Sequence, residues 1–429
     1  MKFKEYLSRI IGPGLISGAA DDDPSGIATY SQSGAQFGLG VLWFALFQYP
    51  LMTAIQEMCA RVGLVTGKGI VGVIKQRYSK KMTIPIVALL LVANTMTIGA
   101  DIGAMGSSVQ LLVPNIPTVF ITILFAVLIL SAEIFFSYKR YAKLLKYTTI
   151  ALFSYVVTAI IVSGNWGMII SSTLIPHFEM NAGFLMMFVA LFGATISPYA
   201  FFWQASEEAE EDVLKNKIEE IGKGTPKVTR KEMRIMRADT AIGMAFSQMI
   251  MWFIIIAAAN TLHVNNITDI QSASDAAKAL EPLVHNFPNA GKIAKILFAS
   301  GIVGTGLLAI PVLAGSSAYA LSDGLGWKEG LCKKFGQAKG FYFVIIGSTV
   351  IGLGINLVNI DPIQALVYAS MISGVIAIPL LVMLLKISND KNILGTKTNG
   401  LLSNVLVWTT VIILGVAAIM MFVVPFVLK

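Results

Sequence analysis

Long apolar runs recur along almost the whole chain and constrain its fold more than any other feature. Runs of roughly 17 to 25 mostly apolar residues are long enough to cross a bilayer as helices. The sequence predicts eleven such helices, at residues 11–37, 40–60, 83–112, 118–136, 147–163, 184–206, 240–262, 296–322, 341–358, 363–385 and 402–428. Of the 429 residues, 55% are hydrophobic and 13% charged, too few charges to cover a soluble surface. The sequence therefore indicates an all-α polytopic membrane protein.

The positions of Lys and Arg test this helix count, because cytosolic loops retain them and translocated loops do not. With eleven helices, 28 of the 32 Lys and Arg residues fall in the N-terminus or in even-numbered loops. Only Lys278, Lys292, Lys295 and Lys429 fall on the other side. We expect a plasma (inner) membrane protein with a cytoplasmic N-terminus and its C-terminus outside. The net charge of +8 then reflects topology and requires no nucleic-acid partner.

Several other functions are excluded by what the sequence lacks. It contains no phosphate-binding glycine loop, nucleophile elbow or zinc signature, so we expect neither ATP-driven transport nor an enzyme, and no cofactor. Cys59 and Cys332 are predicted to be free thiols in cytosolic loops. The acidic run Glu207–Asp212 is predicted to be a solvated helix end. The apolar stretch after the basic N-terminus is interrupted by acids, so no removable signal peptide is expected.

The first predicted helix breaks the rule that membrane spans avoid charge. Residues 12–34 read GPGLISGAADDDPSGIATYSQSG, with Asp21, Asp22, Asp23 and Pro24 at mid-span. One carboxylate there costs roughly 2.5 to 3.5 kcal/mol. One interpretation is a short loop in which Asp23 or Ser25 caps a second half-helix. The other is a cation site, since a broken helix at bilayer depth must face protein or an aqueous cavity.

The sixth predicted helix is interrupted in the same way. Residues 193–206 read GATISPYAFFWQAS, where Gly193 and Pro198 interrupt the apolar run and Thr195, Ser197 and Tyr199 supply oxygens. A simple proline kink is the alternative. Helices one and six begin the two halves of a five-plus-five arrangement, and paired interruptions of this kind indicate a transporter's binding site. Unwound carbonyls of both helices and one carboxylate would suit a hard divalent cation.

These motifs resemble the Nramp family of divalent metal transporters. The resemblance covers most of the chain and rests on GPG, DPSGIAT, SGAQFG and VTGKG near the N-terminus, on SYKRYAKLLKY, and on GATISPYAFFWQAS. It implies a LeuT-type fold with helices one and six broken, and transport of manganese or ferrous iron with protons. The two inverted five-helix repeats would span about residues 11–163 and 184–385, with one extra helix at about 402–428.

The chain also departs from the family's motifs. The family's Asp-Pro-Gly-Asn is Asp23-Pro24-Ser25-Gly26 here, and its Met-Pro-His is Ser197-Pro198-Tyr199. A second family histidine falls at Gln204, and of an acidic pair in the third helix Asp101 is kept while Ala104 is not. This pattern is similar to the Nramp-related magnesium transporters, a branch described as moving magnesium and manganese without proton coupling.

The predicted site follows from this resemblance. The metal-contacting set is Asp23, Ala20, Gly26, Ala194 and Ser197, and the possible ion pathway is Asp21, Asp22, Tyr199, Gln204, Asp101 and Gln364. Losing a thioether removes the preference for soft metals, and losing both histidines removes the side chains best suited to proton relay. Asp101 and Glu133 could still carry protons. We expect import of Mg²⁺ or Mn²⁺ by alternating access, with no obligatory protein partner.

Three rival functions remain. One is a channel, although paired broken helices favour alternating access. A proton-coupled manganese or iron symporter of the ordinary Nramp type differs only in ion choice and coupling. A sodium-coupled amino-acid carrier of the same fold is a different class. Its first-helix break would bind a carboxylate, which Asp21, Asp22 and Asp23 would repel.

Overall fold

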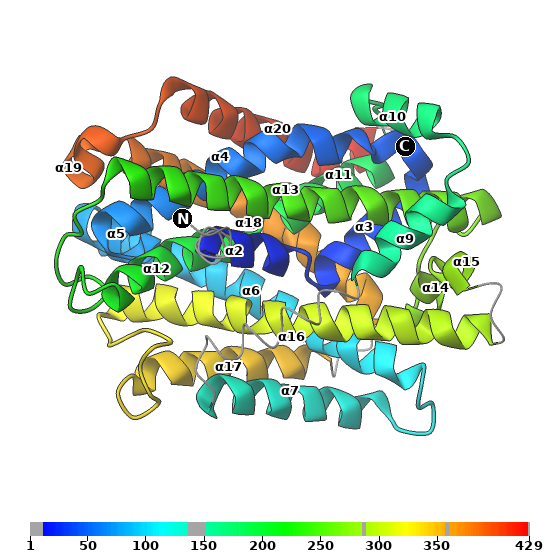
Figure 1. Cartoon of the computed structure of the whole chain (residues 1–429), viewed down its shortest axis with the longest axis horizontal. Helices are drawn as coiled ribbons and strands as arrows, with labels where there is room; N and C mark the ends of the chain where they lie inside the picture. Colours follow the sequence, from blue (N-terminus) through cyan, green and yellow to red (C-terminus); the bar gives the residue numbers. More distant parts are fainter. Residues whose placement is uncertain (1–11, 136–151, 180, 285–288, 357–360, 428–429) are drawn as a thin grey trace, which may run out of the picture.

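The chain folds into a bundle of helices that run mostly along its longest axis (Figure 1). The computed structural model describes residues 12–135, 152–179, 181–284, 289–356 and 361–427. Within these residues the structure is helical, and the only β-type pairing is an isolated bridge between Glu220 and Lys223. An all-helical architecture suits bilayer depth, because each helix satisfies its own backbone hydrogen bonds.

The described helices match the predicted spans in type and order. The longer ones are α2 (Pro13–Asp21), α3 (Pro24–Phe37), α4 (Trp43–Thr66), α6 (Lys80–Gln110), α7 (Thr118–Phe135), α9 (Phe153–Val162), α11 (Ala182–Thr195), α12 (Pro198–Leu214), α13 (Arg230–Thr261), α16 (Ala290–Leu325), α17 (Lys339–Ile355), α18 (Pro362–Asn389) and α20 (Leu401–Val427). Short helices were not predicted: α5 (Ile70–Arg77), α10 (Trp166–Leu174), α14 (Ala273–Lys278), α15 (Glu281–Val284) and α19 (Lys391–Leu394).

The number of membrane crossings differs from the number of helices. By length and apolar composition, 7 helices of the described chain can cross a membrane, or up to 9 if each of two sharply bent pairs counts as one span. The broken first span falls below this length because α2 and α3 have only 9 and 14 residues. Part of the predicted fifth span, 147–151, lies outside the described residues. The count of eleven stays a prediction.

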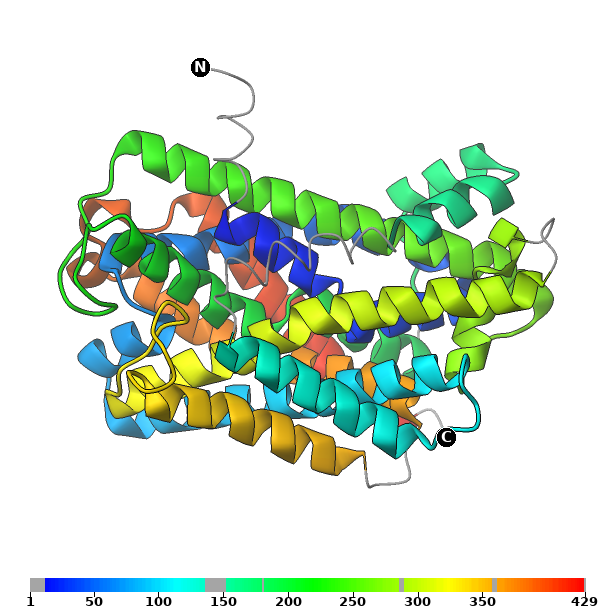
Figure 2. The same ribbon diagram turned by 60° about the horizontal axis from the view of Figure 1, so that its bottom comes forward.

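The two broken spans lie inside the bundle. Almost every residue of α11 and α12 is buried, as are most residues of α2 and α3. Helix α13 packs along α2 and α3, while α18 packs against α11, α6 and α3. Helices α16, α17 and α7 lie along one face (Figure 2). Large apolar side chains such as Phe120 on α7 (66% exposed) and Ile412 on α20 (60%) form an outer surface suited to lipid.

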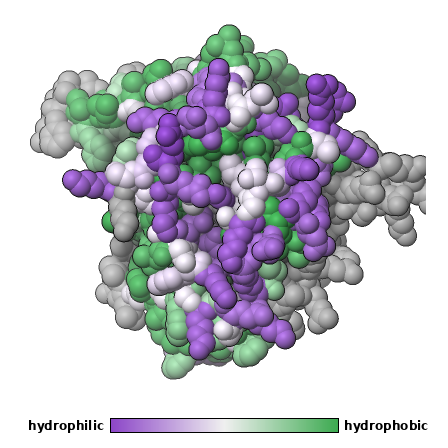
Figure 3. Space-filling model, turned by 90° about the vertical axis from the view of Figure 1, so that its left-hand side faces the viewer, coloured by the Kyte–Doolittle hydropathy of each residue, from purple (hydrophilic) through white to green (hydrophobic). Residues whose placement is uncertain are grey.

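Polar side chains gather at one end of the bundle. Figure 3 shows this end, where the α4–α5, α12–α13, α16–α17 and α18–α20 connections meet. These connections, with α5 and the adjoining helix ends, carry most of the basic residues assigned to the cytosolic side. We call this the basic end and the opposite one the outer end. The predicted fourth basic loop lies within 136–151, outside the described residues.

Two predictions at the basic end are wrong. Cys59 is not in a loop but is buried within α4, which continues to Thr66; Cys332 does lie in a loop. The acidic run is not a solvated helix end, because α12 continues to Leu214 and Glu207, Glu208, Glu210 and Asp212 are buried. The α16–α17 connection folds over them: the Leu331 and Cys332 amides and the Tyr319 hydroxyl all donate hydrogen bonds to Glu210.

Glycines allow the buried helices to approach closely. A methyl group at Gly193 of α11 would lie 1.8 Å from the Ser370 carbonyl oxygen of α18 and 2.4 Å from the Gly374 amide. Nothing lies within 4 Å of the corresponding position at Gly347 of α17. The α11–α18 crossing therefore depends on glycine for its backbone contact.

We expect Gly193→Ala to destabilise the protein and Gly347→Ala to leave it unchanged or slightly more stable. Overpacking costs roughly 1–3 kcal/mol, whereas alanine favours an open helical site by up to about 1 kcal/mol over glycine. Thermal unfolding in detergent, followed by size-exclusion chromatography, measures both. Equal unfolding midpoints for the two variants would contradict the close crossing.

Candidate functional site

Asp23 organises the break between α2 and α3. It is the N-cap of α3, and its Oδ1 accepts hydrogen bonds from the Gly26 amide at 2.7 Å and the Ser25 hydroxyl at 2.6 Å. Pro24 follows at the first helical position, where no amide hydrogen is needed. One carboxylate oxygen of Asp23 therefore caps α3, as the first interpretation of this break predicted. The residue is 1% exposed, and its other oxygen, Oδ2, faces the second broken helix.

The break between α11 and α12 repeats this arrangement. Ser197 occupies the N-cap position of α12, and Pro198 is its first helical residue. The Ser197 hydroxyl does not cap α12; it donates back to the Gly193 and Ala194 carbonyls, each at 3.0 Å. A carbonyl oxygen has two lone pairs, so the Ala194 oxygen keeps one for another partner.

Tyr199 joins the two breaks. Its hydroxyl donates to the Ala20 carbonyl at 2.9 Å, and the same oxygen lies 3.4 Å from Asp23 Oδ2. The first turn of α12 is thereby held against the last turn of α2 and the cap of α3. The structure thus brings Asp23, Ala20 and Tyr199 together in a buried position.

Asp21 and Asp22 turn toward α13. The Ser247 hydroxyl lies 3.1 Å from Asp21 Oδ2 and 3.4 Å from Asp22 Oδ1, and Asp21 also lies within hydrogen-bond reach of Ser197. Both aspartates are 0% exposed, and Asp21 Oδ1 and Asp22 Oδ2 have no hydrogen-bond partner. Among the described residues, no Lys or Arg forms an ion pair with any of the three consecutive aspartates.

Asp101 completes the buried acidic region from α6. It is 0% exposed, interacts electrostatically with Asp23 and lies near the Ser25 amide. Neither carboxylate oxygen accepts a hydrogen bond of normal geometry. Ala104, also buried on α6, supplies no second acid.

Two residues near the breaks were missed by sequence reasoning. Tyr30 is 0% exposed, its hydroxyl has no hydrogen-bond partner, and a methyl group at Gly26 would lie 3.3 Å from that oxygen. Helical spacing could have identified Tyr30, because it follows Gly26 by four residues and residues four apart share a helix face. No local sequence pattern could have identified Ser247, because α13 contacts Asp21 only through tertiary packing.

The side chains of three other oxygen-bearing candidates contact other parts of the fold. Thr195 bonds to Gln48 of α4 at 3.0 Å. The Gln204 amide, oriented so that its nitrogen donates, reaches Ser17 Oγ at 2.6 Å in α2, toward the basic end. Gln364 lines a cavity near the outer end, in the first turn of α18.

The arrangement can hold a hard cation in a mainly oxygen environment. No group of three or more His, Cys, Asp or Glu side chains among the described residues converges on a metal position. The breaks instead offer the carboxylate oxygen of Asp23 that faces the second break, backbone carbonyls of Ala20 and Ala194, and hydroxyls. Carboxylates, carbonyls and water are the ligands that Mg²⁺ and Mn²⁺ prefer.

Known proteins resemble this chain along most of its length. "Divalent metal cation transporter MntH" of Ralstonia nicotianae is 22% identical over 431 residues, covering 96% of this chain and 90% of that protein. The crystal structure of the Eremococcus coleocola manganese transporter, in complex with an aromatic bis-isothiourea substituted compound, matches with a TM-score of 0.73 at 17% identity, covering 97% and 87% of the two chains.

A more distant structure shares the same fold. Mhp1, a nucleobase-cation-symport-1 family transporter, matches with a TM-score of 0.57 at 10% identity, covering 97% of this chain and 91% of that one. The fold is therefore LeuT-type, as predicted. The profile of the family described as "Nramp: Natural resistance-associated macrophage protein-like" matches residues 14–424. This chain is thus a multi-pass membrane protein that belongs to the Nramp family.

Proposed function

We propose that this protein is a plasma-membrane secondary transporter that imports divalent metal cations by alternating access. The observation that carries the proposal is the meeting of the two helix breaks, where Asp23 Oδ2 and the Ala20 carbonyl share the Tyr199 hydroxyl. Relatives described as divalent metal cation or manganese transporters support it. The uncompensated aspartates argue against the amino-acid carrier, whose break must bind a carboxylate.

The proposed ions are Mg²⁺ and Mn²⁺. No thioether stands at the second break, where Ser197 offers a hard oxygen instead. Gly26 adds no side-chain ligand at the first break, and the Tyr30 ring edge lies beside it. Mg²⁺ keeps several of its waters behind one or two carboxylates, which suits a site with one free carboxylate oxygen and several hydroxyls.

Transport is proposed to proceed without proton coupling. Tyr199 and Gln204 occupy the two positions where the family has histidines, and neither titrates near neutral pH. Asp101, which interacts with Asp23, and the buried Glu133 of α7 are the observations that favour the proton-coupled alternative. A divalent cation gains about 4.6 kcal/mol on entry per 100 mV of membrane potential, enough for accumulation without protons.

Asp23→Ala is expected to abolish manganese uptake into proteoliposomes while the protein remains folded. The substitution removes the principal ionic ligand of the proposed site. Glu179→Ala, which removes an acid that is 39% exposed, should transport normally. Near-normal uptake by the Asp23 variant, with normal thermal unfolding, would remove the central claim.

Ser197→Met is expected to improve cadmium binding relative to magnesium. If the sulfur reaches the ion, the change should be on the order of 1 kcal/mol, or about fivefold in relative affinity. Isothermal titration with both ions measures it, and Ser300→Met places the same thioether on an exposed position of α16 as a control. An unchanged cadmium-to-magnesium ratio would mean that residue 197 does not line the site.

Metal uptake is expected to leave internal pH unchanged in liposomes that contain a pH-sensitive dye. The reason is the missing relay, since the lone Asp101 has no titratable partner at Ala104. Manganese or magnesium is added outside and acidification is recorded together with uptake. Acidification that scales with uptake and disappears in Asp101→Asn would establish the proton-coupled alternative.

A further inference from the structure

A cavity of about 280 Å³ lies among α3, α11 and α18. It contacts the last turns of α3 and the first turns of α11 and α18, so it belongs to the outer end. The loop between α13 and α14 contributes Asp269 and Ile270 to its wall. Of the predicted ion-pathway residues, Gln364 lines this cavity, whereas the residues at the two helix breaks do not.

Gln32 fastens that loop to α3. Its side-chain oxygen accepts from the Ile270 amide at 2.8 Å, and its nitrogen donates to the Thr268 carbonyl at 3.1 Å. The amide thus binds the backbone on both sides of Asp269, as a neighbouring β-strand would. Gln32 is only 8% exposed, so this clamp is shielded from water. Asp269 is exposed and is held where it lines the cavity.

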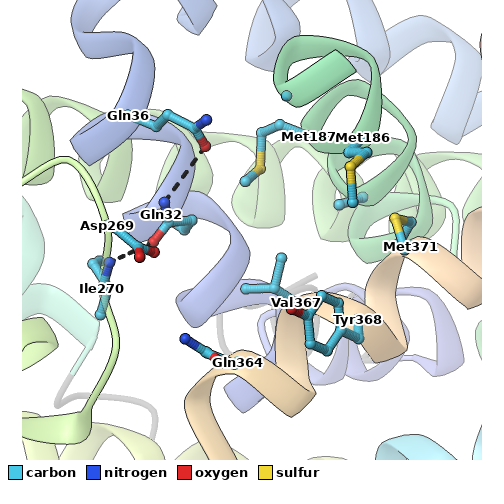
Figure 4. A pocket seen from close by; sticks show the side chains of 12 residues that line it. Gln32, Gln36, Met186, Met187, Asp269, Ile270, Gln364, Val367, Tyr368 and Met371 are labelled. Carbon is cyan, nitrogen blue, oxygen red and sulfur yellow. Dashed lines mark hydrogen bonds between the residues drawn. The ribbon is translucent and has the colours of Figure 1, made fainter. Parts of the chain in front are cut away.

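The cavity has two chemically different walls (Figure 4). Asp269, Gln32 and Gln36 form an oxygen-rich wall, whereas Met186, Met187 and Met371 form a thioether wall. No Lys or Arg is among its described lining residues, so Asp269 is the charged side chain in the lining. Six waters occupy roughly 180 Å³ of liquid volume, which the cavity can accommodate.

The cavity lies above the helix breaks along α3. Gln32 is nine residues beyond Asp23, or about 13 Å at 1.5 Å per residue. Between them the Thr29 hydroxyl lies 3.0 Å from the Ser370 hydroxyl of α18, which closes α3 against α18. Ser370 adjoins Met371, which lines the cavity. An ion in the cavity would therefore be one helix contact away from the proposed transport site.

We propose that this cavity is an outer docking site for a hydrated divalent cation, charged by Asp269 and positioned by Gln32. The inference rests on the proposed function. A carboxylate and neighbouring amides can accept hydrogen bonds from the ion's water shell without displacing it, which suits an ion that sheds water reluctantly. The site raises the local ion concentration before α3 and α18 separate.

Asp269→Asn should raise the KM for manganese and for magnesium on the order of threefold to tenfold, with little change in kcat. Proteoliposome uptake measures both constants. The rise in KM should shrink at high ionic strength, because exposed charges are screened. Glu281→Gln removes the charge of an exposed residue of α15 at the same end and should leave KM unchanged. An unchanged KM in Asp269→Asn would overturn the proposal.

Gln32→Ala tests positioning. It should raise KM like Asp269→Asn, and the double variant should be no worse than Asp269→Asn alone, because Gln32 acts through Asp269. Additive effects would overturn the positioning role.

A direct binding measurement tests whether the cavity itself holds an ion. In Asp23→Ala, titration with Mn²⁺ followed by electron paramagnetic resonance should detect a weak saturable site that Asp269→Asn removes. Absence of that site would overturn the docking proposal while leaving the transport site untouched. Wild-type protein that imports no divalent ion would instead overturn the proposed function.

Discussion

The structure depends on how two interrupted helices satisfy their backbone groups inside the bundle. A helix end leaves several amides and carbonyls without partners, and hydrocarbon offers none. At the first break, Asp23 accepts from the Gly26 amide and Tyr199 donates to the Ala20 carbonyl. At the second, Ser197 donates to two carbonyls. At each break, some carboxylate or carbonyl oxygens can still accept another partner. A cation needs such oxygens as ligands.

The buried negative charges around the breaks also favour a cation. Asp21, Asp22, Asp23 and Asp101 are buried within one region, and no described Lys or Arg pairs with them. Uncompensated buried carboxylates are costly unless protons or a cation neutralise them. The nearby hydroxyls of Ser197, Tyr199 and Ser247 can stabilise the acids but cannot cancel their charge. A region of this kind attracts a cation, as the proposed transport site requires.

Two of the buried acids at the basic end, Glu210 and Asp212, are stabilised differently. Glu210 accepts hydrogen bonds from two backbone amides and a tyrosine hydroxyl, while Asp212 pairs with Lys217 at 3.0 Å. The α16–α17 connection supplies the amides, so a loop far away in the sequence covers the end of α12. Buried acidic residues therefore serve two roles in this protein. The partners that the fold brings to each acid decide which role it has.

The sequence by itself determined the helical class, the order of the long helices and the location of both breaks. Apolar length, proline and acid are local signals, and the bilayer leaves few alternative structures. The same local signals pointed to Asp21, Asp22 and Asp23 at one break and to Ser197 at the other, and the resemblance to the Nramp family singled out Asp23 and Ser197 as the proposed ligands. Sequence could not predict that Ser247 would reach Asp21, that Gln204 would contact α2 instead of the breaks, or that Gln32 would clamp the loop bearing Asp269. Those contacts join residues distant along the chain, and only the packing of α13, α2 and α3 decided them.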